Sequence, residues 1–218
     1  MSCKKYKYVL FDLDGTLTDP FEGITNSVAY SLNFYGITVE DRRQLSCFIG
    51  PPLYESFEKY YGFSSETAVE AVEKYREYYR DRGIFENRLY DGAEKLLAHL
   101  KEQGCIIALA TSKPEVFALR ILEHFGILKY FDVVTGSLLD GSRVKKGEVV
   151  AEALKRLNFP QKDYCIMIGD RSHDIIGAKE NRIDSLGVLF GYGDKEELYH
   201  AGADYIALDF KEIKEILS

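Results

Sequence analysis

Two aspartates separated by one residue follow the first apolar segment of the chain. Asp12 and Asp14 come directly after Tyr8–Phe11, and Gly15 follows them. Residues i and i+2 of an extended chain point the same way, so we expect both carboxylates near one point. Like charges at such short range are costly unless a proton or a cation lies between them, and oxygen ligands suit a hard ion such as Mg²⁺. The alternative is a solvated turn, since D-x-D-G sequences are common in loops.

A second apolar segment, residues 105–110, ends at two hydroxyl residues, Thr111 and Ser112. A hydroxyl together with backbone amides at the start of a helix can bind an anion such as phosphate. The structural alternative is a role in starting the next helix, because Pro114 suits a first helical turn.

A second acidic pair follows the apolar segment 164–168. Asp170 and Asp174 are four residues apart, which places them one helical turn from each other. Helix capping by Asp170, with Asp174 favoured by the helix dipole, is the structural alternative. Both readings can hold together, because a capping residue can also bind a metal.

A phosphate bound beside these acids needs positive charge in addition to a metal. The candidates are Lys113, Arg143, Lys145 and Lys146. Lys146 opens a predicted helix, a position that the helix dipole disfavours for a cation, and this favours a functional role. We therefore choose Lys146, and Lys145 stays open as the alternative.

The elements that must position these residues are strands that alternate with helices. This alternation predicts a doubly wound α/β fold with a parallel sheet, and ligands of such sheets bind at the carboxyl ends of the strands. The strands are predicted at 8–11, 105–110, 131–135, 164–168, 186–189 and 205–208, and helices at 93–103, 115–125, 146–157, 171–181 and the C-terminus.

The stretch from about residue 21 to residue 82 shows helical periodicity and no strand pattern. Ile24, Val28, Leu32 and Tyr35 recur at the spacing of one helix face, and residues 65–82 predict a long amphipathic helix. We therefore predict an all-helical domain, residues 18–85, inserted into an α/β domain formed by residues 1–17 and 86–218.

Composition excludes several classes of protein. The chain has 218 residues, 46% of them hydrophobic, which is enough for a sizeable core, and its net charge of −7 argues against nucleic acid as a partner. The longest apolar run is far below the roughly 18 residues of a membrane span. The N-terminus shows no signal peptide, and the four cysteines are scattered. These features predict reduced thiols and a cytoplasmic protein without a membrane partner.

Taken in order, these motifs resemble those of the haloacid dehalogenase-like (HAD) hydrolases over essentially the whole chain. The matching residues are Asp12-Leu13-Asp14-Gly15-Thr16, the strand end at Thr111, a lysine near position 146, and Gly169-Asp170 with Asp174. The helical insertion resembles the cap of the subgroup that contains phosphoglycolate phosphatase, β-phosphoglucomutase and some nucleotidases. Ile49-Gly50-Pro51-Pro52-Leu53 most resembles phosphoglycolate phosphatase.

The resemblance implies a Rossmann-like core and a Mg²⁺-dependent phosphatase that acts on a small phosphorylated metabolite through an aspartyl-phosphate. It makes Asp12 the nucleophile, Asp14 the general acid and base, and Lys146 the residue that neutralises developing charge. Thr111 and Ser112 would hold the phosphoryl oxygens.

The same resemblance implies a metal site. Asp12, the backbone carbonyl of Asp14 and Asp170 would hold Mg²⁺, with Asp174 in support. One departure concerns the lysine, which stands in a Lys-Pro context in many members but in Arg143-Val144-Lys145-Lys146-Gly147 here. Either Lys145 or Lys146 therefore fits the motif.

Other functions stay open beside phosphoglycolate hydrolysis. They are a 5'-nucleotidase or pyrophosphatase of the same family, and a phosphomutase of the β-phosphoglucomutase type. A phosphoacceptor module of the receiver type is disfavoured, because receivers are smaller and carry no helical insertion. The sequence predicts neither the oligomeric state nor the physiological substrate.

Overall fold

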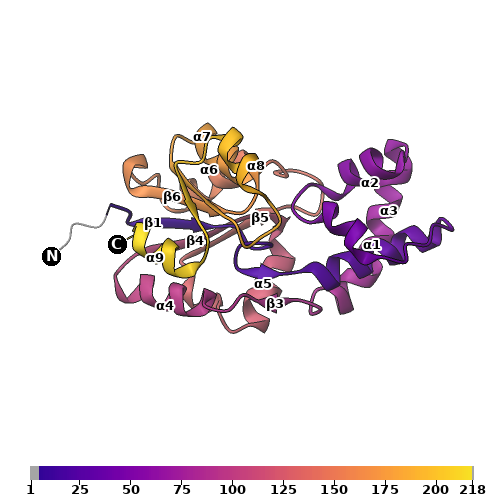
Figure 1. Cartoon of the computed structure of the whole chain (residues 1–218), viewed down its shortest axis with the longest axis horizontal. Coiled ribbons are helices and arrows are strands. Elements are labelled where there is room, and N and C mark those ends of the chain that lie inside the picture. The colour runs from indigo at the N-terminus through magenta and orange to yellow at the C-terminus, as the bar shows by residue number, and fades with distance from the viewer. Residues whose placement is uncertain (1–4, 218) are drawn as a thin grey trace. The chain divides into compact units, whose positions relative to one another are not determined.

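A computed structural model describes residues 5–217 of the chain, which divide into two compact units (Figure 1). One unit contains the described residues up to Thr18 and those from Leu89 onward. The other unit contains Asp19–Arg88. The first is built on a sheet and the second is helical.

A six-stranded sheet forms the centre of the first unit. Its strand order is β5-β4-β1-β6-β7-β8, and neighbouring strands pair in parallel. This confirms the α/β fold predicted from the sequence. The strands are β1 (Tyr8–Phe11), β4 (Ile106–Pro114), β5 (Val133–Ser137), β6 (Cys165–Gly169), β7 (Asp184–Val188) and β8 (Tyr205–Ala207).

Helices cover both faces of this sheet (Figure 1). One layer contains α6 (Lys146–Arg156), α7 (Ser172–Glu180) and α8 (Lys195–Ala201), and the other contains α4 (Ala93–Glu102), α5 (Glu115–His124) and α9 (Phe210–Leu217). Because both faces are covered, Val9, Leu10 and Phe11 of the central strand are fully buried, and the strand is a continuous apolar run. Two short 3-10 turns, η3 (Leu128–Tyr130) and η4 (Lys162–Tyr164), precede β5 and β6.

Two strands differ from the limits predicted by apolar runs. β4 continues to Pro114 instead of ending at residue 110, although its pairing with β5 shifts between Ala110 and Pro114. β7 begins at Asp184 rather than at residue 186, because its first polar residues pair with β6. Ladder hydrogen bonds, rather than hydrophobicity, set these limits.

The helical unit contains α1 (Phe21–Phe34), the 3-10 turn η1 (Arg42–Phe48), α2 (Leu53–Tyr61), α3 (Ser65–Tyr78) and the π-helical turn η2 (Tyr79–Gly83). Its core includes Val28, Leu32, Phe48 and Phe57. The predicted helix over 65–82 is thus an α-helix to Tyr78, after which one wider turn follows.

A second, two-stranded sheet was not apparent from the sequence. It pairs β2 (Thr18–Asp19) with β3 (Arg88–Leu89), the two places where the chain passes between the units. Strands this short carry no period-2 pattern. Within the described residues, no helix is both long and apolar enough to cross a membrane. Cys105 and Cys165 are buried, whereas Cys3 lies outside the described residues.

Candidate active site

The carboxyl ends of three neighbouring strands meet at one edge of the large sheet. Phe11, the last residue of β1, is in register with Leu109 of β4 and with Ile168 of β6. Asp12 continues in the same direction, since its backbone N–H donates to the carbonyl of Ile168 at 2.9 Å. Asp12 therefore lies between the segments that carry Thr111 and Asp170.

Lys146 joins two of the buried acids. Its Nζ lies 2.8 Å from Oδ1 of Asp12 and 2.8 Å from Oδ1 of Asp174, and it donates to the carbonyl of Ala110 at 3.2 Å. Burial lowers the pKa of Lys146, but the two carboxylates outweigh burial and hold its pKa above the ordinary value. The side chain is only 4% exposed, so this charge is fixed in place by its partners.

Asp170 lies in a tight backbone enclosure. Gly15 adopts a left-handed conformation with φ of 83°, and a Cβ atom there would overlap the Asp170 carboxylate. A Cβ atom at Gly191 would also collide with the Asp170 side chain. The backbone N–H of Tyr192 donates to Oδ2 of Asp170 at 2.8 Å. Two glycines and one amide thus fix the direction of this carboxylate.

Asp12, Asp170 and Asp174 form a cluster of buried acids. One carboxylate oxygen from each lies within 4.8 Å of the others. Burial, together with the neighbouring Asp174 and Asp12, raises the pKa of Asp170 to about 8. Burial and Asp12 likewise raise the pKa of Asp174 to about 6, although Lys146 opposes the shift. Such a concentration of oxygen ligands favours a bound divalent cation over a bare site.

Asp174 also shapes the helix that carries it. Its Oδ2 accepts the backbone N–H of Arg171 at 3.1 Å, at the start of α7. The N-cap residue is Arg171, so helix capping by Asp170, the structural alternative from the sequence, is wrong. Asp170 precedes the N-cap residue of α7, and its carboxylate lies in the cluster with Asp12 and Asp174.

Asp14 is paired with a different lysine. Nζ of Lys113 lies 2.7 Å from Oδ2 of Asp14, and the two side chains are 6% and 11% exposed. Burial raises the pKa of Asp14, whereas the Lys113 ammonium lowers it and Asp12 raises it further. Oδ1 of Asp14 is buried and has no hydrogen-bond partner among residues 5–217.

Thr111 and Ser112 follow directly on Ala110, whose carbonyl accepts from Lys146. Thr111 is buried, and its hydroxyl accepts the backbone N–H of Lys113 at 3.3 Å. The carbonyl of Ser112 accepts the hydroxyl of Ser137 at 2.7 Å. Both residues lie where β4 and β5 lose register, beside the buried lysine.

The structure separates the remaining cations from the acids. Lys145 is the exposed N-cap residue of α6, so Lys146 is the lysine that reaches Asp12. Arg143 pairs instead with Glu115 at 3.0 Å and donates to the carbonyl of Gly136. Of the two lysines that fit the motif, only Lys146 is in the acid cluster.

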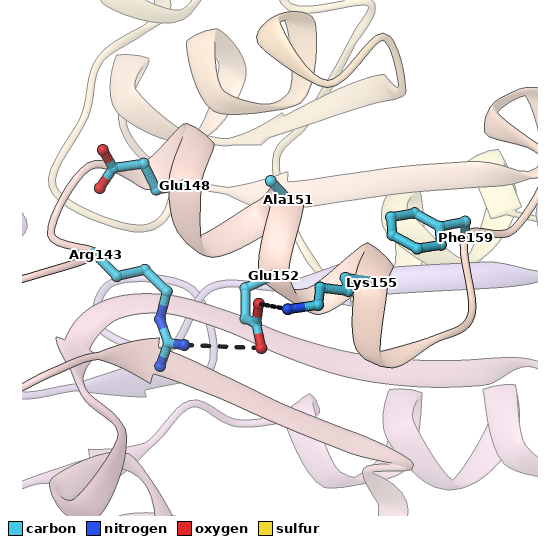
Figure 2. A pocket seen from close by; sticks show the side chains of 6 residues that line it. All are labelled: Arg143, Glu148, Ala151, Glu152, Lys155 and Phe159. Carbon is cyan, nitrogen blue, oxygen red and sulfur yellow. Dashed lines mark hydrogen bonds and ion pairs between the residues drawn. The ribbon is translucent and has the colours of Figure 1, made fainter.

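A surface depression of about 480 Å³ lies elsewhere, along the outer side of α6 (Figure 2). Glu152 pairs there with Lys155 at 3.4 Å and with Arg143 at 3.9 Å. The depression contains none of the clustered acids, so we do not regard it as the active site. Its lining residues are Arg143, Glu148, Ala151, Glu152, Lys155 and Phe159.

Sequence reasoning missed the segment that completes the Asp170 enclosure. Gly191 and Tyr192 contribute a close backbone approach and one amide, and neither leaves a side-chain signature. The available signal was a glycine pair, Gly191 and Gly193, shortly after a predicted strand.

Comparison with known proteins identifies the family of the chain. The family model of the haloacid dehalogenase-like hydrolases matches residues 9–188. The chain belongs to that family, which confirms the family resemblance inferred from the motifs.

Individual relatives match over most of the chain. A protein of Pseudomonas aeruginosa named 5'-nucleotidase is 43% identical over 98% of this chain and 96% of its own length. The tyrosine-protein kinase PtkA of Mycobacterium tuberculosis is 45% identical over 85% of this chain and 62% of its own length. The crystal structure of a predicted phosphatase from Clostridium acetobutylicum has a TM-score of 0.93 and 52% identity, and the match covers 96% of this chain and 97% of that one.

Proposed function

We propose that this HAD-family phosphatase hydrolyses small phosphomonoesters in the presence of Mg²⁺, by way of a phosphorylated Asp12. The observation that carries the proposal is the buried contact of Asp12 with Lys146, 2.8 Å apart, inside a cluster that contains two further acids, Asp170 and Asp174. A buried carboxylate beside a fixed cation is suited to attack a negatively charged phosphoryl group.

In the first half of the reaction, an oxygen of Asp12 attacks phosphorus and the bond from phosphorus to the ester oxygen breaks. Asp14 gives its proton to the departing alkoxide, which leaves as an alcohol. Thr111 and the Ser112 amide hold the phosphoryl oxygens, and Lys146 neutralises the charge that develops on them. The product of this half is an aspartyl-phosphate.

In the second half, water attacks the phosphorus of the aspartyl-phosphate. Asp14, now ionised, takes a proton from that water, and the bond between phosphorus and Asp12 breaks. Inorganic phosphate leaves, and the proton on Asp14 restores the starting state. One residue therefore serves as acid and then as base.

The acid cluster fits Mg²⁺. Asp12, Asp170 and the backbone carbonyl of Asp14 would hold the ion, with Asp174 in support, and all of these are the oxygen donors that Mg²⁺ prefers. Three of the carboxylates are already buried and close together, with the pKa of Asp170 raised by that proximity. When bound, the ion offsets negative charge on the phosphoryl group and on its nucleophile.

Two substrates are favoured by different observations. The Pseudomonas aeruginosa relative named 5'-nucleotidase favours a nucleoside monophosphate. The resemblance of residues 49–53 to phosphoglycolate phosphatase favours phosphoglycolate. We propose that residues 18–85 form a cap that selects between such substrates, and that the protein acts in the cytoplasm without nucleic-acid or membrane partners.

The test is phosphate release from phosphoglycolate, nucleoside monophosphates, sugar phosphates and pyrophosphate, with Mg²⁺ and with EDTA. We expect turnover only with Mg²⁺, and a loss of more than about a thousandfold in Asp12→Asn. Asp163→Asn, which changes an exposed aspartate of the same unit, is the matched control and should keep full activity.

Retained turnover in Asp12→Asn would refute the nucleophile. Isomerisation of β-glucose 1-phosphate, faster than phosphate release, would make the protein a phosphomutase instead. Stable phosphorylation without turnover would favour a phosphoacceptor.

A further inference from the structure

Lys113 is a buried cation that the reaction described above does not use. Its side chain is 6% exposed, and its Nζ lies 2.7 Å from Oδ2 of Asp14. A buried ion pair adds little stability compared with apolar side chains of the same volume. Stability alone therefore gives no reason for a lysine at this position.

The backbone on either side of the pair is held by hydrogen bonds. Beside Lys113, the carbonyl of Ser112 accepts the hydroxyl of Ser137 at 2.7 Å, and Pro114 is in register with Ser137. Beside Asp14, the backbone N–H of Gly15 donates to the carbonyl of Thr18 at 2.8 Å. The ion pair thus connects two anchored segments and fixes the rotation of the Asp14 carboxyl group.

The two oxygens of Asp14 differ in their surroundings. Oδ2 faces the Lys113 ammonium, whereas Oδ1 is buried without a hydrogen-bond partner among the described residues. A protonated carboxyl group still accepts a hydrogen bond at its carbonyl oxygen, so Lys113 can hold Oδ2 whether or not Oδ1 carries a proton.

We propose that Lys113 is a positioning residue that holds Oδ2 of Asp14, so that Oδ1 is the oxygen that exchanges the proton with the leaving group. The inference rests on the proposed function, in which Asp14 is the general acid. The proton moves from Oδ1 to the ester oxygen as the phosphorus–oxygen bond breaks, and the ammonium of Lys113 keeps its own protons throughout.

The experiment compares two substrates that differ only in their leaving group, phenyl phosphate and 4-nitrophenyl phosphate, with Mg²⁺ present. The 4-nitrophenolate anion departs readily without a proton, whereas phenolate depends more on a general acid. The quantity measured is the ratio of kcat/KM for phenyl phosphate to kcat/KM for 4-nitrophenyl phosphate. This ratio reports the first half of the reaction, in which the leaving group departs.

In Lys113→Met we expect this ratio to fall at least about tenfold, as part of the effect of general acid catalysis. Asp14→Asn should lower the ratio in the same direction, and adding Lys113→Met to Asp14→Asn should lower it no further. Lys113→Arg should restore part of the ratio. Lys129→Met, which removes an exposed lysine paired with Glu94, is the matched control and should leave the ratio unchanged.

An equal loss for both substrates in Lys113→Met, or a rise in KM alone, would overturn the positioning role while leaving the phosphatase in place. A wild-type protein inactive toward both substrates would overturn the proposed function and this inference with it. If Lys113→Met does not fold, Lys113→Gln gives the same comparison with an uncharged side chain.

Discussion

The carboxylate of Asp170 occupies the space in which a side chain at Gly15 would lie. Gly15 has φ of 83°, so its backbone also favours glycine. The turn after Asp14 and the Asp170 side chain therefore pack directly against each other. Two separate reasons favour glycine at position 15, namely its left-handed backbone and the space that Asp170 fills.

Gly15→Ala should destabilise the protein more than the backbone conformation alone explains. Gly104→Ala is the matched control, because Gly104 has φ of 78° and open space around its Cβ position. We expect a loss of about 1 kcal/mol in Gly104→Ala and a further 1 to 3 kcal/mol in Gly15→Ala. Urea unfolding measures the free energy of unfolding of both variants. Equal losses would show that the Asp170 side chain moves aside with no loss of stability.

Lys146→Met should leave the carboxylates of Asp12 and Asp174 buried without their cation. We expect a loss of about 3 kcal/mol in the free energy of unfolding, together with a fall in kcat of at least about a hundredfold. Lys155→Met, which removes an exposed lysine of the same helix, should change stability by less than about 0.5 kcal/mol. Comparable stability of the two variants would argue against a structural role for the buried lysine.

Stabilisation by Mg²⁺ should increase with pH. Without metal, folded Asp170 keeps its proton up to about pH 8, whereas its ordinary pKa is 3.8. The metal-free protein therefore loses stability as pH rises from about 4 to about 8, because the unfolded chain releases the proton first. Mg²⁺ replaces that proton, so the rise in Tm on adding Mg²⁺ should be larger at pH 8 than at pH 6. Asp170→Asn should abolish most of this difference, and an equal rise at both pH values would contradict the assignment.

Glu197→Gln should weaken the attachment of α8 to the start of α7. Glu197 accepts the backbone N–H and the hydroxyl of Ser172 at 2.7 and 2.8 Å, and Nε of Arg171 at 3.0 Å. Burial raises the pKa of Glu197, but these hydrogen bonds outweigh it and hold the pKa below its ordinary 4.5. Its contribution is thus present above pH 4.5 and is lost as pH falls through the lowered value.

At pH 7 we expect Glu197→Gln to lose about 1 to 2 kcal/mol in urea unfolding, and the difference from wild type to shrink as pH falls below 4.5. Glu196→Gln, at the exposed neighbouring position, should match wild type at every pH. A difference that stays constant down to acidic pH would contradict the role of the charge.

The placement of Asp12, Thr111 and Asp170 at one edge of the sheet was predictable, because a single rule governs the ends of parallel strands. The apolar runs before Asp12, Thr111 and Asp170 predicted strands, and parallel strands bring their carboxyl ends to the same edge. The choice between Lys145 and Lys146 was harder, since both open the same helix. Lys146 is the buried residue of the two and the one that pairs with Asp12, and burial depends on tertiary packing rather than on local pattern.

Other features depend on backbone groups and tertiary contacts, which residue types indicate only weakly. Tyr192 acts through its backbone amide, so its side-chain type carries no information about Asp170. Lys113 lies in the segment where β4 and β5 lose register, and its pairing with Asp14 joins residues that are far apart in the sequence. Hydrophobic periodicity indicates which residues are buried, but it does not indicate which backbone groups form contacts or hydrogen bonds.

The place of β1 in the sheet has a consequence for biosynthesis. It is a central strand, and its two neighbours begin only at Ile106 and Cys165, far later in the sequence. During translation this apolar strand leaves the ribosome long before either partner, while the helical residues that follow can already make their local contacts. We expect the strands of this sheet to pair late and slowly, because bringing together segments that are distant in the sequence costs conformational entropy. Until those neighbouring strands have been made, this apolar strand lacks its partners, and a chaperone that binds short apolar segments has a target there.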